Sequence, residues 1–68
     1  MDKIENAIAH HLSIYKGTVR TEVLYRYLSS LFDPKDAHIT VMNMLNEGLI
    51  RGDGENIIMA ERLKERIG

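Results

Sequence analysis

The sequence of 68 residues predicts one mostly helical α+β domain, spanning residues 1–68. We expect a core of three helices, one short strand, a C-terminal β hairpin and a short terminal helix. Three observations lead to this fold class. Apolar residues recur at helical spacing in three segments. A short β-branched stretch separates the first two segments, and a glycine-rich turn between two apolar runs follows the third.

The first two predicted helices lie on either side of the β-branched stretch "GTVRT". The first runs from about residue 2 to 15, and its apolar face comprises Ile4, Ala7, Ile8, His11, Leu12 and Tyr15. Gly17 ends this pattern. Thr21 is expected to cap the second helix. The buried stripe of that helix comprises Leu24, Tyr27, Leu28 and Leu31.

The third predicted helix, residues 33–47, has the clearest N-terminus in the chain. The Asp33 side chain can accept hydrogen bonds from free backbone N–H groups, and Pro34 suits the first helical position. Asp36 lies in the first turn, where the helix dipole favours an anion. The inner face comprises Ala37, Val41, Met44, Leu45 and Gly48. Gly48 also provides the left-handed residue that ends many helices.

A β hairpin is predicted after this helix. Residues 49–52 and 56–59 are short apolar runs, and the Asp-Gly pair between them favours a tight turn. The stretch "TVR" can add a third strand, and residues 60–68 predict a short helix with Leu63 and Ile67 on its apolar face. The predicted core comprises Ile8, Leu12, Leu24, Leu28, Val41, Leu45, Ile50 and Ile58.

This order of elements resembles the winged helix-turn-helix family, and the resemblance extends from Asp2 to about Met59. Its most specific part is "VMNMLNEGLIRGDGENIIM", which is similar to a recognition helix followed by the wing. The resemblance implies a small DNA-binding protein, a transcriptional regulator, with helix 33–47 in the major groove and residues 49–59 as the wing. The same fold also serves as a protein-interaction module, so this alternative stays open.

The charge of the chain favours neither alternative by itself. Nine Lys and Arg residues oppose ten Asp and Glu residues, and residues 33–48 hold one cation and three carboxylates. The chain has no cysteine, and its N-terminal stretch has polar and acidic residues where a signal peptide needs an apolar run. No window approaches the roughly 18 apolar residues of a membrane span. We therefore expect a cytoplasmic protein without membrane contact.

Three other kinds of site are disfavoured. The tripeptide Arg51-Gly52-Asp53 matches an adhesion motif, but the turn alone accounts for it. His10 and His11 are adjacent on a helix, whereas helical metal pairs need a spacing of three or four residues, so we expect no metal site. The sequence has neither a phosphate-binding loop nor a nucleophile with a base. We expect neither an enzyme nor a cofactor.

Candidate DNA-binding residues follow from the helical wheel and from the resemblance. The outer face of the third helix presents Lys35, Asp36, Ile39, Asn43 and Asn46, with Thr40 and His38 at its flanks. An amide such as that of Asn43 can bond adenine, and the Thr40 hydroxyl can reach a base or a phosphate. The resemblance places further phosphate contacts at Arg20, Arg26 and Arg51. Arg26 and Arg51 can instead pair with carboxylates such as Glu22 or Glu55.

A protein partner is the main alternative for the same helix. Ile39 and Met42, with the acidic Asp33, Asp36 and Glu47 nearby, suit a protein surface better than a DNA groove. In a second arrangement Met42 packs under the second helix and only Ile39 is exposed. A homodimer is also expected, through the first helix and the C-terminal segment around Leu63 and Ile67, because a chain this short has a thin core.

Overall fold

The computed structural model describes residues 2–67, which form four helices and a three-stranded antiparallel sheet. Along the chain the elements are α1 (Lys3–Ile14), β1 (Thr18–Arg20), α2 (Thr21–Ser29), α3 (Pro34–Asn46), β2 (Ile50–Gly52), β3 (Asn56–Met59) and α4 (Glu61–Ile67). The predicted α+β class and the order of its elements are confirmed. No helix in the described part of the chain has the length and apolar character needed to cross a bilayer.

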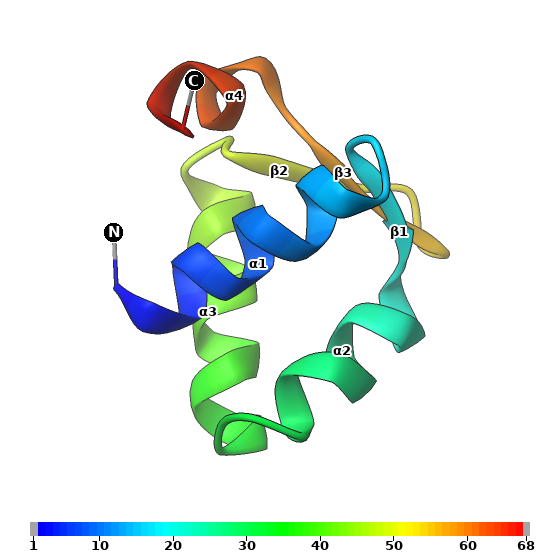
Figure 1. Ribbon diagram of the computed structural model, residues 1–68, viewed down its shortest axis with the longest axis vertical. Coiled ribbons are helices and arrows are strands. Elements are labelled where there is room, and N and C mark those ends of the chain that lie inside the picture. Colours follow the sequence, from blue (N-terminus) through cyan, green and yellow to red (C-terminus); the bar gives the residue numbers. More distant parts are fainter. Residues whose placement is uncertain (1, 68) are drawn as a thin grey trace.

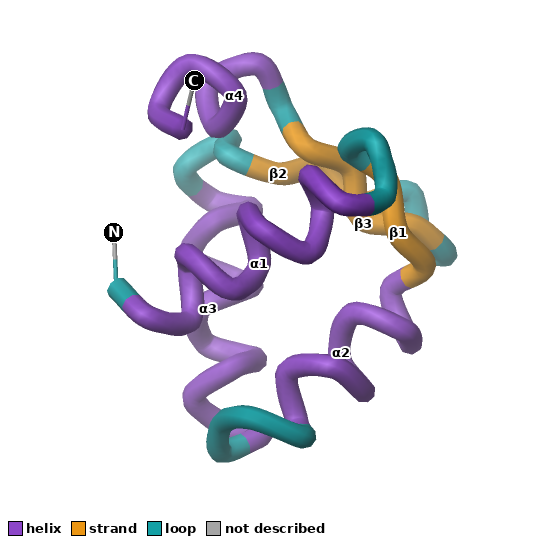
Figure 2. Tube along the Cα trace, viewed as in Figure 1, coloured by secondary structure: helices purple, strands orange, loops and turns teal. Residues whose placement is uncertain are grey.

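The first three helices pack against one another, and the sheet lies at one end of this group. In Figure 1, α1 passes in front of α3, with which it is in contact, while α2 lies at the lower right. Figure 2 shows the three strands gathered at the upper right, with α4 at the top of the view. α2 and α3 contact each other, and each of them also contacts α1. The loop between α2 and α3 lies at the end of the molecule away from the sheet (Figure 2).

The core lies between the helices and the inner face of the sheet. Six of the predicted core residues are almost completely buried, namely Ile8, Leu12, Leu24, Leu28, Val41 and Ile50. Further core residues are Ala9, Val19, Ala37, Met44, Leu49, Ile57, Met59 and Leu63. Leu45 is only partly buried, contrary to the prediction, because it lies at the side of α3 against the hairpin.

The sheet has β3 in the centre, between β1 and β2. Ile58 of β3 lies opposite Thr18 of β1 and Arg51 of β2. The preceding residue, Ile57, lies opposite Val19 of β1. Because side chains alternate between the faces of a strand, Ile57 points into the core and Ile58 points outward. The prediction that Ile58 is buried is therefore wrong. Ile57 and Met59 occupy the core positions instead.

The first helix begins with a reciprocal pair of hydrogen bonds. The Asp2 carboxylate accepts from the Glu5 N–H at 2.8 Å, and the Glu5 carboxylate accepts from the Asp2 N–H at 3.1 Å. This capping box satisfies two N–H groups that have no partner within the helix. The helix ends at Ile14, and Gly17 has a positive φ of 95°. Tyr15 lies beyond the last turn and is exposed, although the sequence pattern placed it on the apolar face.

The second helix differs from the prediction at both ends. Thr21 is its first residue and not its cap, and Arg20 occupies the capping position without a side-chain hydrogen bond. The Thr21 N–H donates to the Glu55 carbonyl at 2.7 Å, so the hairpin supplies the partner that a capping side chain would otherwise provide. Leu31 lies beyond Ser29, the last residue of α2, and 56% of its surface is exposed.

The third helix and the hairpin follow the prediction closely. Asp33 Oδ1 accepts from the Lys35 N–H at 2.8 Å, and Pro34 begins the helix. At the other end Gly48 has a φ of 75°, a left-handed conformation that glycine adopts at low cost. β2 and β3 then pair in antiparallel orientation. In the turn, Asp53 Oδ1 accepts from the Glu55 and Asn56 N–H groups at 3.0 and 2.8 Å.

Candidate nucleic-acid interface

One face of α3 remains exposed along the whole helix. Its inner side is buried through Ala37, Val41 and Met44. The outer side presents five exposed residues, Lys35, Ile39, Met42, Asn43 and Asn46, which we call the α3 outer face. Ile39 and Met42 are 52% and 43% exposed, so Met42 does not pack under α2. No other element of residues 2–67 covers this face, and a flat or grooved partner has access to it.

Thr40 does not belong to this face. Its side chain lies on the inner side of α3, where the residue is largely buried. The hydroxyl donates to the Asp36 carbonyl at 2.9 Å, one helical turn earlier. Its only proton is therefore already engaged within the helix. We withdraw Thr40 from the candidate DNA-binding residues.

A hydrogen bond joins the outer surfaces of α2 and α3. The Tyr25 hydroxyl lies 2.9 Å from His38 Nδ1, and the two rings are tilted against each other at 5.8 Å between centroids. Burial raises the pKa of Tyr25, so the phenol stays protonated and can donate to the histidine nitrogen. This contact helps to fix α3 relative to α2. Nothing in the sequence indicated it, because thirteen positions separate the two residues.

The four cations proposed to contact phosphates differ in whether they already form an ion pair. Arg20 forms an ion pair with Glu22, at 3.1 Å between Nη2 and Oε1. The side chains of Arg26, Lys35 and Arg51 are exposed and form no ion pair with any residue in the range 2–67. The carboxylates suggested as their partners are thus not engaged with them. These three cations are available to a phosphate, whereas Arg20 must first leave Glu22.

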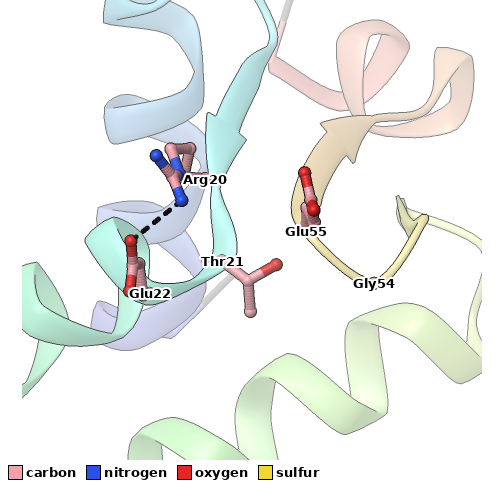
Figure 3. Close-up of a pocket in the computed structure, with 5 residues that line it drawn as sticks. All are labelled: Arg20, Thr21, Glu22, Gly54 and Glu55. Carbon is pink, nitrogen blue, oxygen red and sulfur yellow. Dashed lines mark ion pairs between the residues drawn. The ribbon is translucent and has the colours of Figure 1, made fainter.

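A shallow hollow lies between the start of α2 and the hairpin turn. Figure 3 shows the residues that line it, namely Arg20, Thr21, Glu22, Gly54 and Glu55. The Arg20 guanidinium is directed towards Glu22, and the Glu55 carboxylate stands on the opposite wall. Glu22 balances the charge of Arg20, and the Glu55 carboxylate leaves the hollow with a net negative charge, which makes it unsuitable for an anion such as phosphate.

Arg62 of α4 has a structural partner that the sequence did not reveal. Its Nη1 donates to the Glu47 carbonyl at 2.8 Å, at the C-terminal end of α3. The last carbonyl groups of a helix have no partner within it, so this bond caps α3. The cation also matches the negative end of the helix dipole. Arg62 is thereby linked to the folding of α3 and is not a free phosphate ligand.

The three histidines lie in different surroundings. His11 is buried, and its ring stacks on Tyr27 at 4.2 Å and is tilted against Tyr15 at 5.0 Å. Its Nε2 is buried and has no hydrogen-bond partner among residues 2–67. His10 is exposed, and His38 is bonded to Tyr25. Within residues 2–67 no group of three or more His, Cys, Asp or Glu side chains could hold a metal ion.

The buried His11 makes stability depend on pH. Burial, with a smaller contribution from the charge of His10, lowers the pKa of His11 below its usual 6.5. The unfolded chain therefore binds this proton more readily than the folded one. We expect the free energy of unfolding to be constant above about pH 7.5 and to fall as the pH drops below 6.5.

Chemical denaturation at several pH values tests this expectation. His11→Phe keeps an aromatic ring against Tyr27 and should remove most of the slope between about pH 7 and 5. The control His38→Gln leaves the buried ring in place and should keep the slope. Asp53 does not interfere, because backbone hydrogen bonds from Asn56 and Glu55 lower its pKa below 3.8, outside this range. An unchanged slope in His11→Phe would contradict the assignment.

Comparisons of the chain with protein-family models, with curated proteins and with solved structures gave no match.

Proposed function

We propose that this chain is a winged helix-turn-helix domain that binds double-stranded DNA and acts as a transcriptional regulator. In this proposal α3 is the recognition helix and the β2–β3 hairpin is the wing. The observation that carries it is the α3 outer face, which is uncovered from the first turn to the last and holds both amides and a cation. The major groove of B-DNA is wide enough to admit one α-helix in this way.

The proposal gives different roles to the exposed side chains. Asn43 is directed to base edges, and Ile39 contacts the methyl group of a base. Lys35, Arg26 and Arg51 contact phosphates from α3, α2 and the hairpin. Arg20 joins them only if its ion pair with Glu22 opens. Three free cations are offset by Asp36 of α3 and the two carboxylates at its ends, Asp33 and Glu47, so we expect modest affinity for a single copy.

Two substitutions are expected to affect DNA binding in different ways. Asn43→Ala should reduce discrimination at one base pair by about 1–3 kcal/mol, because it removes a base contact. Arg51→Ala should weaken binding to all duplexes alike and make the salt dependence shallower by about one unit of slope. Arg66→Ala removes a cation of α4 outside the proposed interface and serves as the control. Fluorescence anisotropy with labelled duplexes at several salt concentrations measures all three.

We also propose a homodimer, but with a contact that involves Ile67 and α1 and not Leu63. Leu63 is fully buried in the core of its own chain, so it cannot contact a second copy. Ile67 is exposed and lies beside a hollow formed with Asn6, Ala9, His10 and Ser13 of α1. We propose that a second copy packs here, which would double the number of phosphate contacts. Light scattering at high micromolar concentration should give the mass of a dimer, and a monomer mass would reject this contact.

The second candidate function is protein binding through the same helix. The exposure of both Ile39 and Met42 favours it, since exposed apolar pairs are frequent in protein interfaces. Asp36 and Glu47 also repel phosphates on that helix. A chain that binds no duplex at low salt, in any sequence, would support this candidate against DNA binding.

A further inference from the structure

The α3 outer face is unusual in the kinds of side chain that it combines. Ile39 and Met42 are three positions apart and therefore lie on the same side of the helix. Asn43 and Asn46 follow in its last two turns, and Lys35 lies in the first turn. The face holds no arginine. Asp36 and Glu47 lie at its edge, on the side of Asn43.

Each of these side-chain types favours particular base edges in the major groove. Asparagine bonds the N6 and N7 atoms of adenine, and apolar side chains contact the C5 methyl group of thymine. Guanine is read most often by arginine or lysine through O6 and N7. The face thus has readers for adenine and thymine in its centre and C-terminal half, whereas its one cation, Lys35, is assigned to a phosphate in the proposed function.

We infer that the α3 outer face selects A·T base pairs, with Ile39 and Met42 against thymine methyl groups and Asn43 and Asn46 on adenine. This inference rests on the proposed function and states which duplexes the same face prefers. The carboxylates at the edge do not contribute to this selectivity, because they can accept from a G·C pair as well as from an A·T pair. Asp36 and Glu47 can accept only from a cytosine amine or from the N6 amine of adenine.

The apolar pair on this face can cover methyl groups of bases. Ile39 and Met42 are each about half exposed and form an apolar patch of two side chains. Their exposed neighbours three or four positions away on the helix are polar, namely Lys35, Asp36, His38, Asn43 and Asn46. A thymine methyl is small enough to be covered by a single apolar side chain.

Four duplexes of equal length test the inference by anisotropy at about 50 mM salt. The first contains mixed A·T pairs, and the second contains the corresponding G·C pairs. The third replaces every thymine by uracil, which removes only the methyl groups. The fourth contains inosine·cytosine pairs, which resemble A·T in the minor groove and G·C in the major groove. The four together separate reading by methyl contact in the major groove from reading in the minor groove.

We expect the A·T duplex to bind at least about fivefold more tightly than the G·C and inosine·cytosine duplexes. Uracil should weaken binding about threefold to fourfold for each methyl group contacted. Ile39→Ala should lose the part of this uracil effect that comes from its own methyl contact, and the part from Met42 should remain. The matched control is Ile14→Ala, which removes an isoleucine of α1 that is 59% exposed, and it should retain the effect in full. Both residues are exposed, so circular dichroism should show the folded spectrum for both variants.

The outcomes separate this inference from the proposed function. Equal binding to all four duplexes would overturn the inference and leave DNA binding intact. Binding to inosine·cytosine pairs as tight as to A·T pairs would overturn it, because the minor groove would then carry the selectivity. An affinity for A·T pairs that is unchanged by uracil would overturn the methyl contacts of Ile39 and Met42. Failure to bind any duplex would reject the proposed function itself, and the A·T preference with it.

Discussion

Leu28→Ala is expected to lower the free energy of unfolding by about 2–5 kcal/mol. Leu28 is completely buried on α2, within the core that also holds Leu12 and Leu24. Its truncation removes apolar contacts and leaves a cavity that the surrounding helices can fill only in part. A chain of 68 residues has a total stability of roughly 3–10 kcal/mol. The substitution should therefore remove a large share of the total stability.

Leu31→Ala is the matched control for this substitution. It removes the same atoms from the same residue type just after α2, but Leu31 is exposed. Its effect on the free energy of unfolding should stay below about 0.5–1 kcal/mol. Urea denaturation of the wild type and both variants gives the comparison. A loss below about 1 kcal/mol for Leu28→Ala would show that α2 presents another face to the core.

The second large effect is expected at Ile57, in the central strand. Ile57→Ala should cost about 2–4 kcal/mol, whereas Ile58→Ala should cost about 1 kcal/mol or less. The two isoleucines are adjacent and chemically identical, so they differ only in the face of the sheet on which they lie. Gly52 and Val19 are the cross-strand neighbours of Ile57 on the core face.

This pair of variants tests the register of the hairpin directly. A shift of one residue between β2 and β3 would exchange the two faces of β3. The larger loss would then occur in Ile58→Ala. Equal losses in the two variants would indicate that β3 is covered on both faces. Denaturation midpoints measured side by side under one set of conditions are sufficient, because both variants lose the same atoms.

Signals that act within a few residues allowed most of the fold to be predicted. Asp33 and Pro34 determine the start of α3 through groups that are adjacent in the chain, and Gly48 determines its end through its own backbone conformation. The Asp53-Gly54 turn places β2 against β3 by a local rule as well. Helical spacing also identified Ile8, Leu12, Leu24 and Leu28 as buried, but it missed the buried Ala9 and wrongly included the exposed Tyr15 and Leu31.

The errors concern features that depend on distant parts of the chain. The burial of Ile57 in place of Ile58 follows from the pairing of β3 with β1, forty residues away in sequence. The start of α2 is held by the Glu55 carbonyl and not by a neighbouring side chain. An apolar run such as "NIIM" contains no alternation, so sequence alone cannot choose which isoleucine points inward.

For the candidate site as well, features set by local spacing were predicted and contacts between side chains were not. Helical spacing identified Lys35, Ile39 and Asn43 as outward residues of α3, and the structure brings them onto one exposed face. It also placed Thr40 at the flank, where the hydroxyl turned inward to bond the Asp36 carbonyl. Neither the Tyr25–His38 bond nor the Arg20–Glu22 pair was predicted, because each depends on rotamers that sequence does not specify.

Binding of the chain to random-sequence duplex over a salt series tests the central claim most directly. Each phosphate contact releases counterions, so the logarithm of the binding constant should fall linearly with the logarithm of the salt concentration. With Arg26, Lys35 and Arg51 engaged, we predict a slope of about −3 for one copy and about −6 for a dimer. The absence of any duplex binding at about 50 mM salt, or binding that does not change with salt, would contradict a DNA-binding role for α3.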